Sequence, residues 1–418
     1  MMCRSQRGKV NVTMIHVDIS NVWGAISLQD LLGIEQEIFA AHMAAAEQEC
    51  AVLLPEQEML EKICGTARRI RENSDVLVVL GTGGNCLGIR GVLELLQGPD
   101  RNLKNLSVIF AGNSLSTRQW KQLRENLEGK RFSVLILSGP GDGRESLLIL
   151  RDLKWTLDRK YGTDESSRRI IAAASSADER LNRMAQAYGW DCFEIPAGCG
   201  GSFGVLSAAG LLVMEAAGLD ASAMWQGAAE AQKELDLRSF ENPVWLYAAV
   251  RNLMLRCGKT MELVSAWEPG FSSFGAWWRQ LFLEGEGRGL IPVSALLPGD
   301  NHLLERMLQG QRENFLETMV QFTPVEESCI ISLDANNLDE LNHLSDRMLS
   351  DLEEETCLQT LENRMDQGIG MITLECGDLE ERTVGQLICF LELSCAVSAY
   401  TLGVCPWEKT EEPQEEEG

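Results

Sequence analysis

Four side chains that can take up, release or orient a proton lie close together in the sequence. They are Gln280, Glu284, Glu286 and His302. Carboxylates and imidazoles are the groups that proteins most often use for general acid–base catalysis. The whole chain contains only four histidines, so an imidazole this near to two carboxylates stands out. The segment is therefore a candidate for proton-transfer chemistry.

The spacing inside this segment predicts how the groups are carried. Gln280 and Glu284 are four residues apart, which places them one turn apart on the same face of a helix. We expect that helix to end in the acidic, glycine-broken loop 283–287 and a strand to follow at 290–293. A plainer interpretation stays open, in which the two glutamates are solvated loop residues and the histidine is a surface cap.

The elements that must position these groups begin with short apolar runs in the first half of the chain. Three such runs each lead into a glycine, at residues 75–81, 107–112 and 132–139, and a fourth strand is expected at 169–173. Helical segments separate the runs, and parallel strands need such crossovers. Runs that are apolar at nearly every position indicate strands buried on both faces. The first half therefore predicts a parallel sheet covered by helices.

A second and shorter alternation of strands and helices follows. A helix of small residues is expected over 205–217, with more helix to about residue 256. Further segments are expected after it, in this order: strands near 260–266, 289–292, 329–333 and 371–374, and a closing helix over 384–402. The pattern predicts an α/β protein with two sheet domains.

The expected domain limits follow from these patterns. Residues 1–50 form an N-terminal helical segment, with a helix over 28–50, and a second helix starts after Pro55 at about 56–72. The first αβα domain covers 51–215 and the second covers 216–406, and the acidic tail 407–418 is expected to be disordered. The two sheet domains therefore divide most of the chain between them.

Charge excludes one broad class of partner. The chain has 62 acidic and 37 basic residues and a formal net charge of −25. Such a surface repels the phosphate backbone of a nucleic acid. An anionic small molecule would need a local site of backbone N–H groups or hydroxyls. We therefore expect no nucleic acid as a partner.

Composition also predicts the compartment. No run of eighteen apolar residues is present and the N-terminus lacks the pattern of a signal peptide, so no membrane association is expected. The thirteen cysteines are scattered without paired spacing, which is typical of reduced thiols in a cytoplasmic protein. No cysteine and histidine cluster has the spacing of zinc ligands. We expect neither a metal nor a cofactor.

Five segments of the chain, taken in order, resemble the phosphoglucose isomerase family. They read VLVVLGTGGNCLGIRG at 76–91, FAGNSLS at 110–116, IPAGCGGSFGVLSAAGLL at 195–212, WWRQLFLEGEGRGLIPVSALLPGDNH at 277–302 and VGQLICFLELSCAVSAYTLGVCPW at 384–407. Each segment alone is a weak signal, since a glycine turn after a strand fits many α/β proteins. Together they occur in the family's order and are spread over most of the chain, from residue 76 to residue 407.

The resemblance implies a fold and an activity. The family fold consists of two αβα sandwich domains of sugar-isomerase (SIS) type, with parallel sheets and the site between them, usually in a homodimer. The implied reaction is aldose–ketose isomerisation of a hexose 6-phosphate, between glucose 6-phosphate and fructose 6-phosphate, through an enediol. The family base falls on Glu284, its glutamine on Gln280, and the ring-opening histidine of the partner subunit on His302. The implied substrate-binding positions are Gly84, Asn85, Ser138, Gly201 and Ser202.

The groups that would handle negative charge differ from the family pattern. The arginine of the family's GGRFS falls on Ser202, and a neutral hydroxyl does not replace a guanidinium. The phosphate loop becomes SGPGDGRES at 138–146, with an acid and a proline among its residues. The ring-opening lysine falls on Glu416, with Lys409 as the candidate substitute. Two further interpretations therefore stay open: a catalytically inactive paralogue that binds a sugar or a protein partner, and an isomerase of unphosphorylated sugars.

Overall fold

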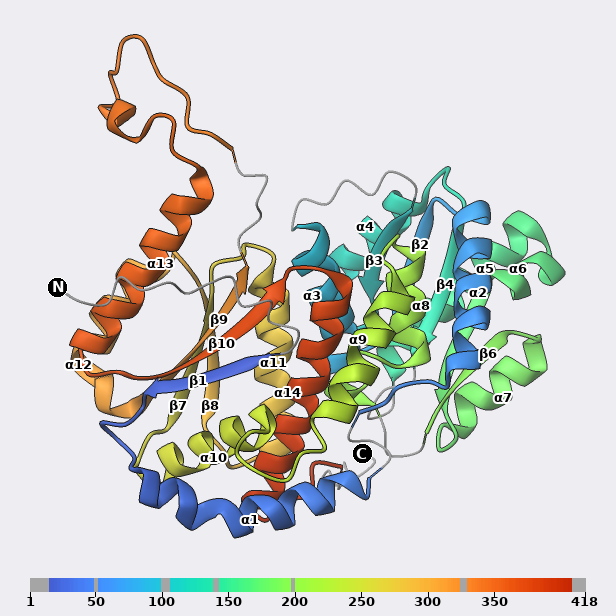
Figure 1. The fold of residues 1–418 in the computed structure, drawn as a ribbon. Helices are drawn as coiled ribbons and strands as arrows, with labels where there is room; N and C mark the ends of the chain where they lie inside the picture. The colour runs from blue at the N-terminus through green and yellow to red at the C-terminus, as the bar shows by residue number, and fades with distance from the viewer. Residues whose placement is uncertain are drawn as a thin grey trace.

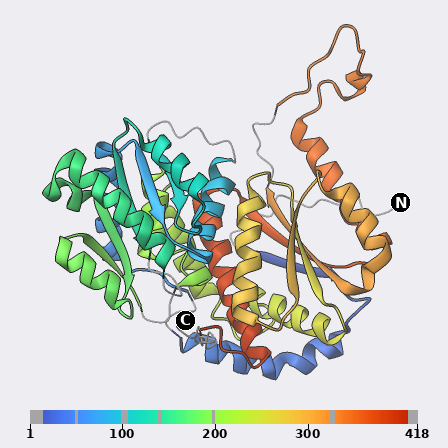
Figure 2. The same cartoon turned by 180° about the vertical axis from the view of Figure 1, so that it is seen from behind.

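A computed structural model describes residues 15–48, 52–98, 106–137, 143–196, 200–323 and 329–407. These residues form two five-stranded sheets with helices on both faces of each (Figure 1). The view from behind shows the same two αβα sandwiches side by side, with helices packed between them (Figure 2). The predicted α/β class with two sheets of mostly parallel strands is confirmed.

The first sheet has the strand order β3-β2-β4-β5-β6, and all its pairs are parallel. Its strands are β2 (Val76–Leu80), β3 (Ser107–Ala111), β4 (Phe132–Leu137), β5 (Ile170–Ser175) and β6 (Asp191–Ile195). Its helices are α2 (Gln57–Asn73), α3 (Gly84–Gln97), α4 (Thr117–Leu127), α5 (Arg144–Tyr161), α6 (Thr163–Arg169), α7 (Glu179–Tyr188) and α8 (Ala208–Ala216).

Alternate side chains of the first sheet point into two different cores. Val76, Val78 and Leu80 of β2 pack with α4, α5 and α7 on the outer face. Leu77 and Val79 pack with α2, α3 and α8 on the inner face. All five residues of β2 are buried, as the apolar run predicted for a strand covered on both sides.

The second sheet has the order β1-β10-β9-β7-β8, in which only the β1–β10 pair is antiparallel. Its strands are β1 (His16–Asn21), β7 (Met261–Ala266), β8 (Ile291–Leu296), β9 (Phe315–Thr323) and β10 (Gly370–Asp378). Its helices are α1 (Leu28–Ala46), α9 (Ala221–Glu234), α10 (Pro243–Arg256), α11 (Phe271–Glu286), α12 (Asn301–Gln311), α13 (Leu349–Asp366) and α14 (Glu381–Thr401).

One continuous hydrophobic core joins the two sheets. The inner faces of both sheets, with α3, α8, α10, α11 and α14, contribute side chains to the same cluster of buried residues. The outer face of the second sheet has a smaller core of its own under α12 and α13. The helices between the sheets therefore fix the position of one sheet relative to the other.

Close packing of α3 against α11 forms the seam between the sheets. A side chain at Gly91 would place its Cβ 2.7 Å from the Cα of Phe274, and one at Gly270 would come 2.3 Å from the carbonyl oxygen of Glu94. Glycine is required where two backbones approach this closely. The pairings show that α3 and α11 run antiparallel, so the start of α3 meets the end of α11.

Several predicted elements differ from the observed ones. The predicted strand 329–333 is wrong: these residues make a single isolated bridge, from Ile330 to Met348, and Leu333 is 71% exposed. The strand in that place is β9, whose apolar run is interrupted by the adjacent polar residues Glu317 and Thr318. The N-terminal segment is not helical throughout, because β1 pairs with β10. The domain limits near residues 50 and 215 stay predictions.

Helix α14 has the length and hydropathy of a membrane-crossing helix, with a mean hydropathy of 1.4 over its most apolar window. That window is 89% buried inside the fold, against α1, α9, α10 and α11. A mostly buried apolar helix is what the core of a folded domain also contains. The helix is therefore weak evidence for a membrane span.

Candidate active site

Glu284 lies in the last turn of α11 rather than in a loop. The helix continues through Glu286 and ends at Gly287, which adopts a left-handed conformation with φ of 62°. The predicted loop 283–287 is therefore wrong for all but its last residue, because a glycine inside a helix lowers its stability without ending it. Glu284 is exposed, whereas Glu286 is buried.

The carboxylate of Glu284 is held on both of its oxygens. The Nε2 amide of Gln280 donates to Oε1 at 2.5 Å. The Oγ hydroxyl of Ser202 donates to Oε2 at 2.6 Å, and the Ser202 backbone N–H donates to the same oxygen at 3.2 Å. The i, i+4 spacing predicted that Gln280 and Glu284 share a face, and this geometry is confirmed.

Ser202 itself is fixed from three sides. It lies in a short 3₁₀ turn (Gly201–Phe203) after β6 and is fully buried. The indole Nε1 of Trp277, one turn before Gln280 on α11, donates to its carbonyl oxygen at 2.8 Å. A Cβ on Gly84 would lie 1.9 Å from its Oγ. The first residues of α3 therefore lie against the Ser202–Glu284 pair.

Gly84, Gly201 and Ser202 thus meet Gln280 and Glu284 at one point, beside the loop that follows the carboxyl end of β2. Ligands of parallel sheets bind at the carboxyl ends of the strands, where loops and helix N-termini collect. The N-terminus of α3 adds a positive partial charge to this point. The structure brings five of the predicted site residues together there.

Asn85 is close to this point but turned away from solvent. Its side chain is 5% exposed and lies under the turn at Gly204, where a Cβ would come 2.2 Å from the Asn85 Oδ1. Among the described residues, this Oδ1 has no hydrogen-bond partner. A buried carbonyl oxygen without a partner costs free energy. Access of a sugar hydroxyl to Asn85 would require the turn 200–204 to move.

The charge around Glu284 is unusual for an anion site. Within the described ranges, Glu284 has no ion pair with an arginine or a lysine, and its donors are all neutral. Glu286, two residues later, is instead paired with Arg251 of α10, whose Nη2 lies 3.1 and 2.9 Å from its two oxygens. Sequence reasoning missed Arg251, since nothing in its local pattern connects it to α11.

His302 lies far from Glu284 within the chain. It is exposed at the start of α12, which follows the carboxyl end of β8. Helix α11 starts at that same edge of the sheet, at Phe271, and Glu284 lies 13 residues along it, roughly 20 Å at the usual helical rise. The closeness of the two residues in sequence therefore does not make them neighbours in the fold.

Some of the predicted site positions lie outside the described residues. They are Ser138, Lys409 and Glu416. Of the predicted phosphate loop 138–146, the structure describes residues 143–146, with Gly143 in a left-handed conformation before α5. Over the described parts of the chain, no three His, Cys, Asp or Glu side chains are arranged to hold a metal ion.

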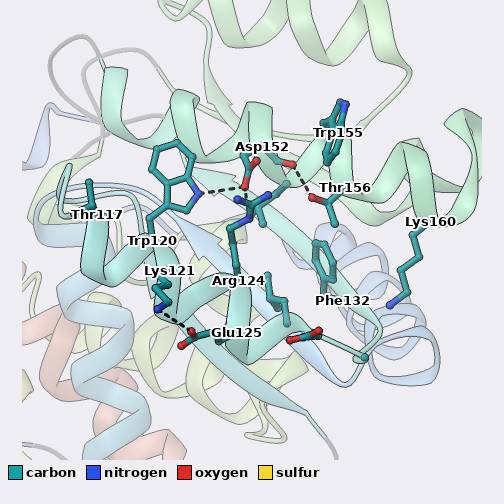
Figure 3. A pocket seen from close by; sticks show the side chains of 14 residues that line it. Thr117, Trp120, Lys121, Arg124, Glu125, Phe132, Asp152, Trp155, Thr156 and Lys160 are labelled. Carbon is teal, nitrogen blue, oxygen red and sulfur yellow. Dashed lines mark hydrogen bonds and ion pairs between the residues drawn. The ribbon is translucent and has the colours of Figure 1, made fainter.

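The large cavity near α4 is separate from this site. It has a volume of about 830 Å³ and lies between α4 and α5, with Trp120, Arg124 and Trp155 on its walls (Figure 3). Phe132, the first residue of β4, and residues 127–129 at the end of α4 line it, so part of it lies near the amino ends of the strands. The Glu284 site is at the opposite edge of the first sheet.

Comparison with known proteins gives clear relatives. The chain is 35% identical over 359 residues to the glucose-6-phosphate isomerases of Staphylococcus saprophyticus and Staphylococcus epidermidis, which covers 85% of this chain and 81% of each relative. No protein-family model matches the chain.

Two solved structures are similar in fold. A hypothetical protein from Thermus thermophilus superposes with a TM-score of 0.81 at 20% identity, over 95% of this chain and 97% of that one. A glucose-6-phosphate isomerase from Chlamydia trachomatis gives a TM-score of 0.69 at 15% identity, over 95% and 86% of the two chains. At these identities the similarity concerns the fold alone.

Proposed function

Because this chain belongs to the glucose-6-phosphate isomerase family, we propose that it interconverts the aldose and ketose forms of a hexose 6-phosphate with Glu284 as the base. The observation that carries the proposal is the arrangement of the Glu284 carboxylate. It is exposed, it is oriented on both oxygens by Gln280 and Ser202, and it lies at the carboxyl edge of a parallel sheet.

This arrangement suits proton transfer between adjacent carbons. Glu284 takes the proton from C2 of the open-chain aldose, the electrons of that C–H bond form the C1–C2 double bond, and the π electrons of the C1 carbonyl move onto O1 to give an enediolate. Transfer of the O2 proton to O1, and return of the proton from Glu284 to C1 as the C2 carbonyl forms, give the ketose. The neutral hydrogen bonds hold the carboxylate in place without neutralising its charge, so the charge remains available to the reaction.

Negative charge in the enediol must be stabilised without the family's arginine. The N-terminus of α3 lies beside Ser202, and a Cβ on Gly83 would come 3.7 Å from the Gln280 amide. Backbone N–H groups and the helix dipole favour an anion at such a place. In this proposal they take the role that a guanidinium has elsewhere, Gly84 and Gly201 line the substrate, and Asn85 contacts it only if the turn 200–204 moves aside.

We also propose that the active form is a homodimer, in which His302 acts opposite Glu284 of the second copy. The separation of the two residues within one chain supports this. Residues 329–348 form an arm that projects from the fold (Figure 1). Several apolar side chains on it are exposed, including Ile330 at 62% and Leu338 at 87%. Apolar surface of this kind marks an interaction site. The thirteen scattered cysteines, without paired spacing, support a cytoplasmic location.

The test is a coupled assay of purified protein with glucose 6-phosphate and fructose 6-phosphate. Glu284→Gln is expected to lower kcat by about 10²–10⁴-fold, the usual contribution of a general base. The control is Glu72→Gln, which changes an exposed glutamate in the last turn of α2. Equal turnover by the wild type and Glu284→Gln would falsify the role of Glu284.

One observation favours the inactive paralogue as a second candidate. Ser202 is fully buried and neutral at the position where the family resemblance has an arginine. A folded wild-type dimer without turnover of either sugar phosphate would support this alternative. Thermal-shift measurements with sugar phosphates and with neutral sugars would then separate a phosphosugar-binding protein from one that recognises unphosphorylated sugars or none.

A further inference from the structure

The last three residues of α11 face three different surroundings. Glu284 is exposed at the carboxyl edge of the first sheet. Gly285 lies against α14, where a Cβ would come 2.4 Å from the Sγ of Cys395. Glu286 points the other way and is 1% exposed. The same turn therefore carries the candidate base on one side and a buried carboxylate on the other.

Glu286 belongs to a buried ionic cluster that connects four elements. Arg251 of α10 is 1% exposed and bonds Glu286 through Nη2 and Glu262 of β7 through Nη1. The remaining oxygen of Glu262 accepts 2.6 Å hydrogen bonds from the Tyr247 hydroxyl and the Thr318 hydroxyl. The cluster thus joins the end of α11 to α10, β7 and β9.

The guanidinium is also held by ring contacts. It lies 4.1 Å from the centre of the Phe282 ring, one turn before Glu286 on α11. A cation over an aromatic face is stabilised, more so when it is out of water. Arg251 therefore touches α11 at two successive turns, and Glu284 lies between them.

The residues in the last turn of α11 do not favour a helix by themselves, so the contacts with Arg251 are needed to stabilise it. Residues 283–286 include two glutamates and no basic residue, and the negative end of the helix dipole disfavours carboxylates there. Helix ends also fray because their carbonyls lack partners within the helix. Without an anchor, the turn that carries Glu284 would open readily.

We propose that Glu286 and Arg251 are positioning residues, which keep the last turn of α11 helical and so hold Glu284 between Gln280 and Ser202. This inference rests on the proposed role of Glu284. It differs from a purely stabilising role, because it predicts a loss in the chemical step that exceeds any loss of fold or of substrate binding.

Glu286→Gln is the suitable variant, because it keeps the shape of the side chain and leaves the Arg251–Glu262 pair intact. We expect kcat to fall about 10- to 100-fold, as small misplacements of a catalytic group do, with KM within about twofold of wild type. The control is Glu215→Gln, which weakens a partly buried pair with Arg71 between α2 and α8. The kcat of Glu215→Gln should stay within about twofold of the wild-type value, even when this variant loses as much unfolding free energy as Glu286→Gln does.

Hydrogen exchange gives a readout that does not depend on turnover. Amides of residues 282–286 should exchange at least about tenfold faster in Glu286→Gln, and not in Glu215→Gln, if opening of this turn is controlled by the pair. Unchanged exchange, or unchanged kcat in an active enzyme, overturns the positioning role. If the wild type is inactive but exchange is faster in Glu286→Gln, the proposed isomerase function is wrong, while the Glu286–Arg251 pair still holds the last turn of α11 in place.

Discussion

The end of α11 and the middle of α14 each bury a glutamate, and they do so in opposite ways. Glu286 is paired with Arg251 inside the cluster that includes Glu262. Glu392 of α14 is fully buried, and neither of its oxygens has a hydrogen-bond partner among the described residues. Burial therefore raises the pKa of Glu392 well above its ordinary value.

The comparison of Glu286 with Glu392 shows two ways in which this fold buries a carboxyl group. A buried carboxylate next to a guanidinium forms an ion pair that ties elements together, whereas burial without a partner favours the neutral form of a carboxyl group. The two regions meet at Gly285 and Cys395, and burial, followed by the charge of Glu286, raises the pKa of that thiol. Four substitutions test the comparison.

The largest effect is expected from Arg251→Met. The methionine fills part of the space but leaves Glu262 and Glu286 buried without a counter-charge. Breaking a buried pair in this way costs about 3–5 kcal/mol of unfolding free energy, which urea denaturation followed by fluorescence would measure. A loss below about 1 kcal/mol, the value typical of an exposed pair, would show that the cluster is not a desolvated one.

Glu392→Gln should change how stability depends on pH. In the wild type, the folded pKa lies above the unfolded one of about 4.3. Stability from this group is therefore complete below about pH 4.3 and falls, by at most about 1.4 kcal/mol per pH unit, until the folded pKa is reached.

The glutamine does not titrate, so the difference in unfolding free energy between Glu392→Gln and wild type should grow in favour of the variant from about pH 5 to about pH 8. Denaturant titrations at several pH values measure it. A difference that stays constant over this range contradicts a neutral Glu392. The control is Glu72→Gln, which removes an exposed carboxylate from a helix.

Gly285→Ala tests the contact between the two regions. The new Cβ would lie 2.4 Å from the Cys395 sulfur and 3.4 Å from the Phe203 ring. Overpacking of this kind costs about 1–3 kcal/mol. Combining it with Cys395→Ala should recover most of the loss in thermal or urea unfolding. No recovery in the double variant would mean that another contact causes the loss.

The smallest effect is expected from Tyr247→Phe. It removes one hydrogen bond to Glu262 and leaves the other, from Thr318, in place. Burial raises the pKa of the Tyr247 phenol to about 12, so the hydroxyl remains a hydrogen-bond donor. A single buried hydrogen bond contributes about 1 kcal/mol, and Tyr247→Phe should lose about that much unfolding free energy when Arg251 is present. The loss should be smaller in the Arg251→Met background, and a double-mutant cycle measures the difference.

The sequence predicted the parts of the fold that local patterns determine. The runs at β2, β3 and β4 are mostly apolar and were expected as strands. β9 was missed because its polar residues are satisfied inside the core: Glu317 bonds Ser265 and Arg364. The sequence instead predicts a strand at 329–333, since a short apolar run has the pattern of a strand even when it is exposed.

The candidate site was predictable only over short distances along the chain. The Gln280–Glu284 hydrogen bond follows from helical spacing. The contact of Ser202 with Glu284 joins residues 82 positions apart, and the Arg251–Glu286 pair joins two different helices. Such contacts depend on how the sheets pack together, and a single sequence carries no local signal for them.

The glycine seam between α3 and α11 has a mechanical consequence. At Gly91 and Gly270 backbone packs against backbone, so at these two points no side chain lies between α3 and its neighbour to absorb a rotation. Hinge bending needs a few compliant residues between rigid parts. We therefore expect α3 and α11 to keep a constant spacing, so that opening and closing near Glu284 depends on loops rather than on a rotation of one sandwich relative to the other.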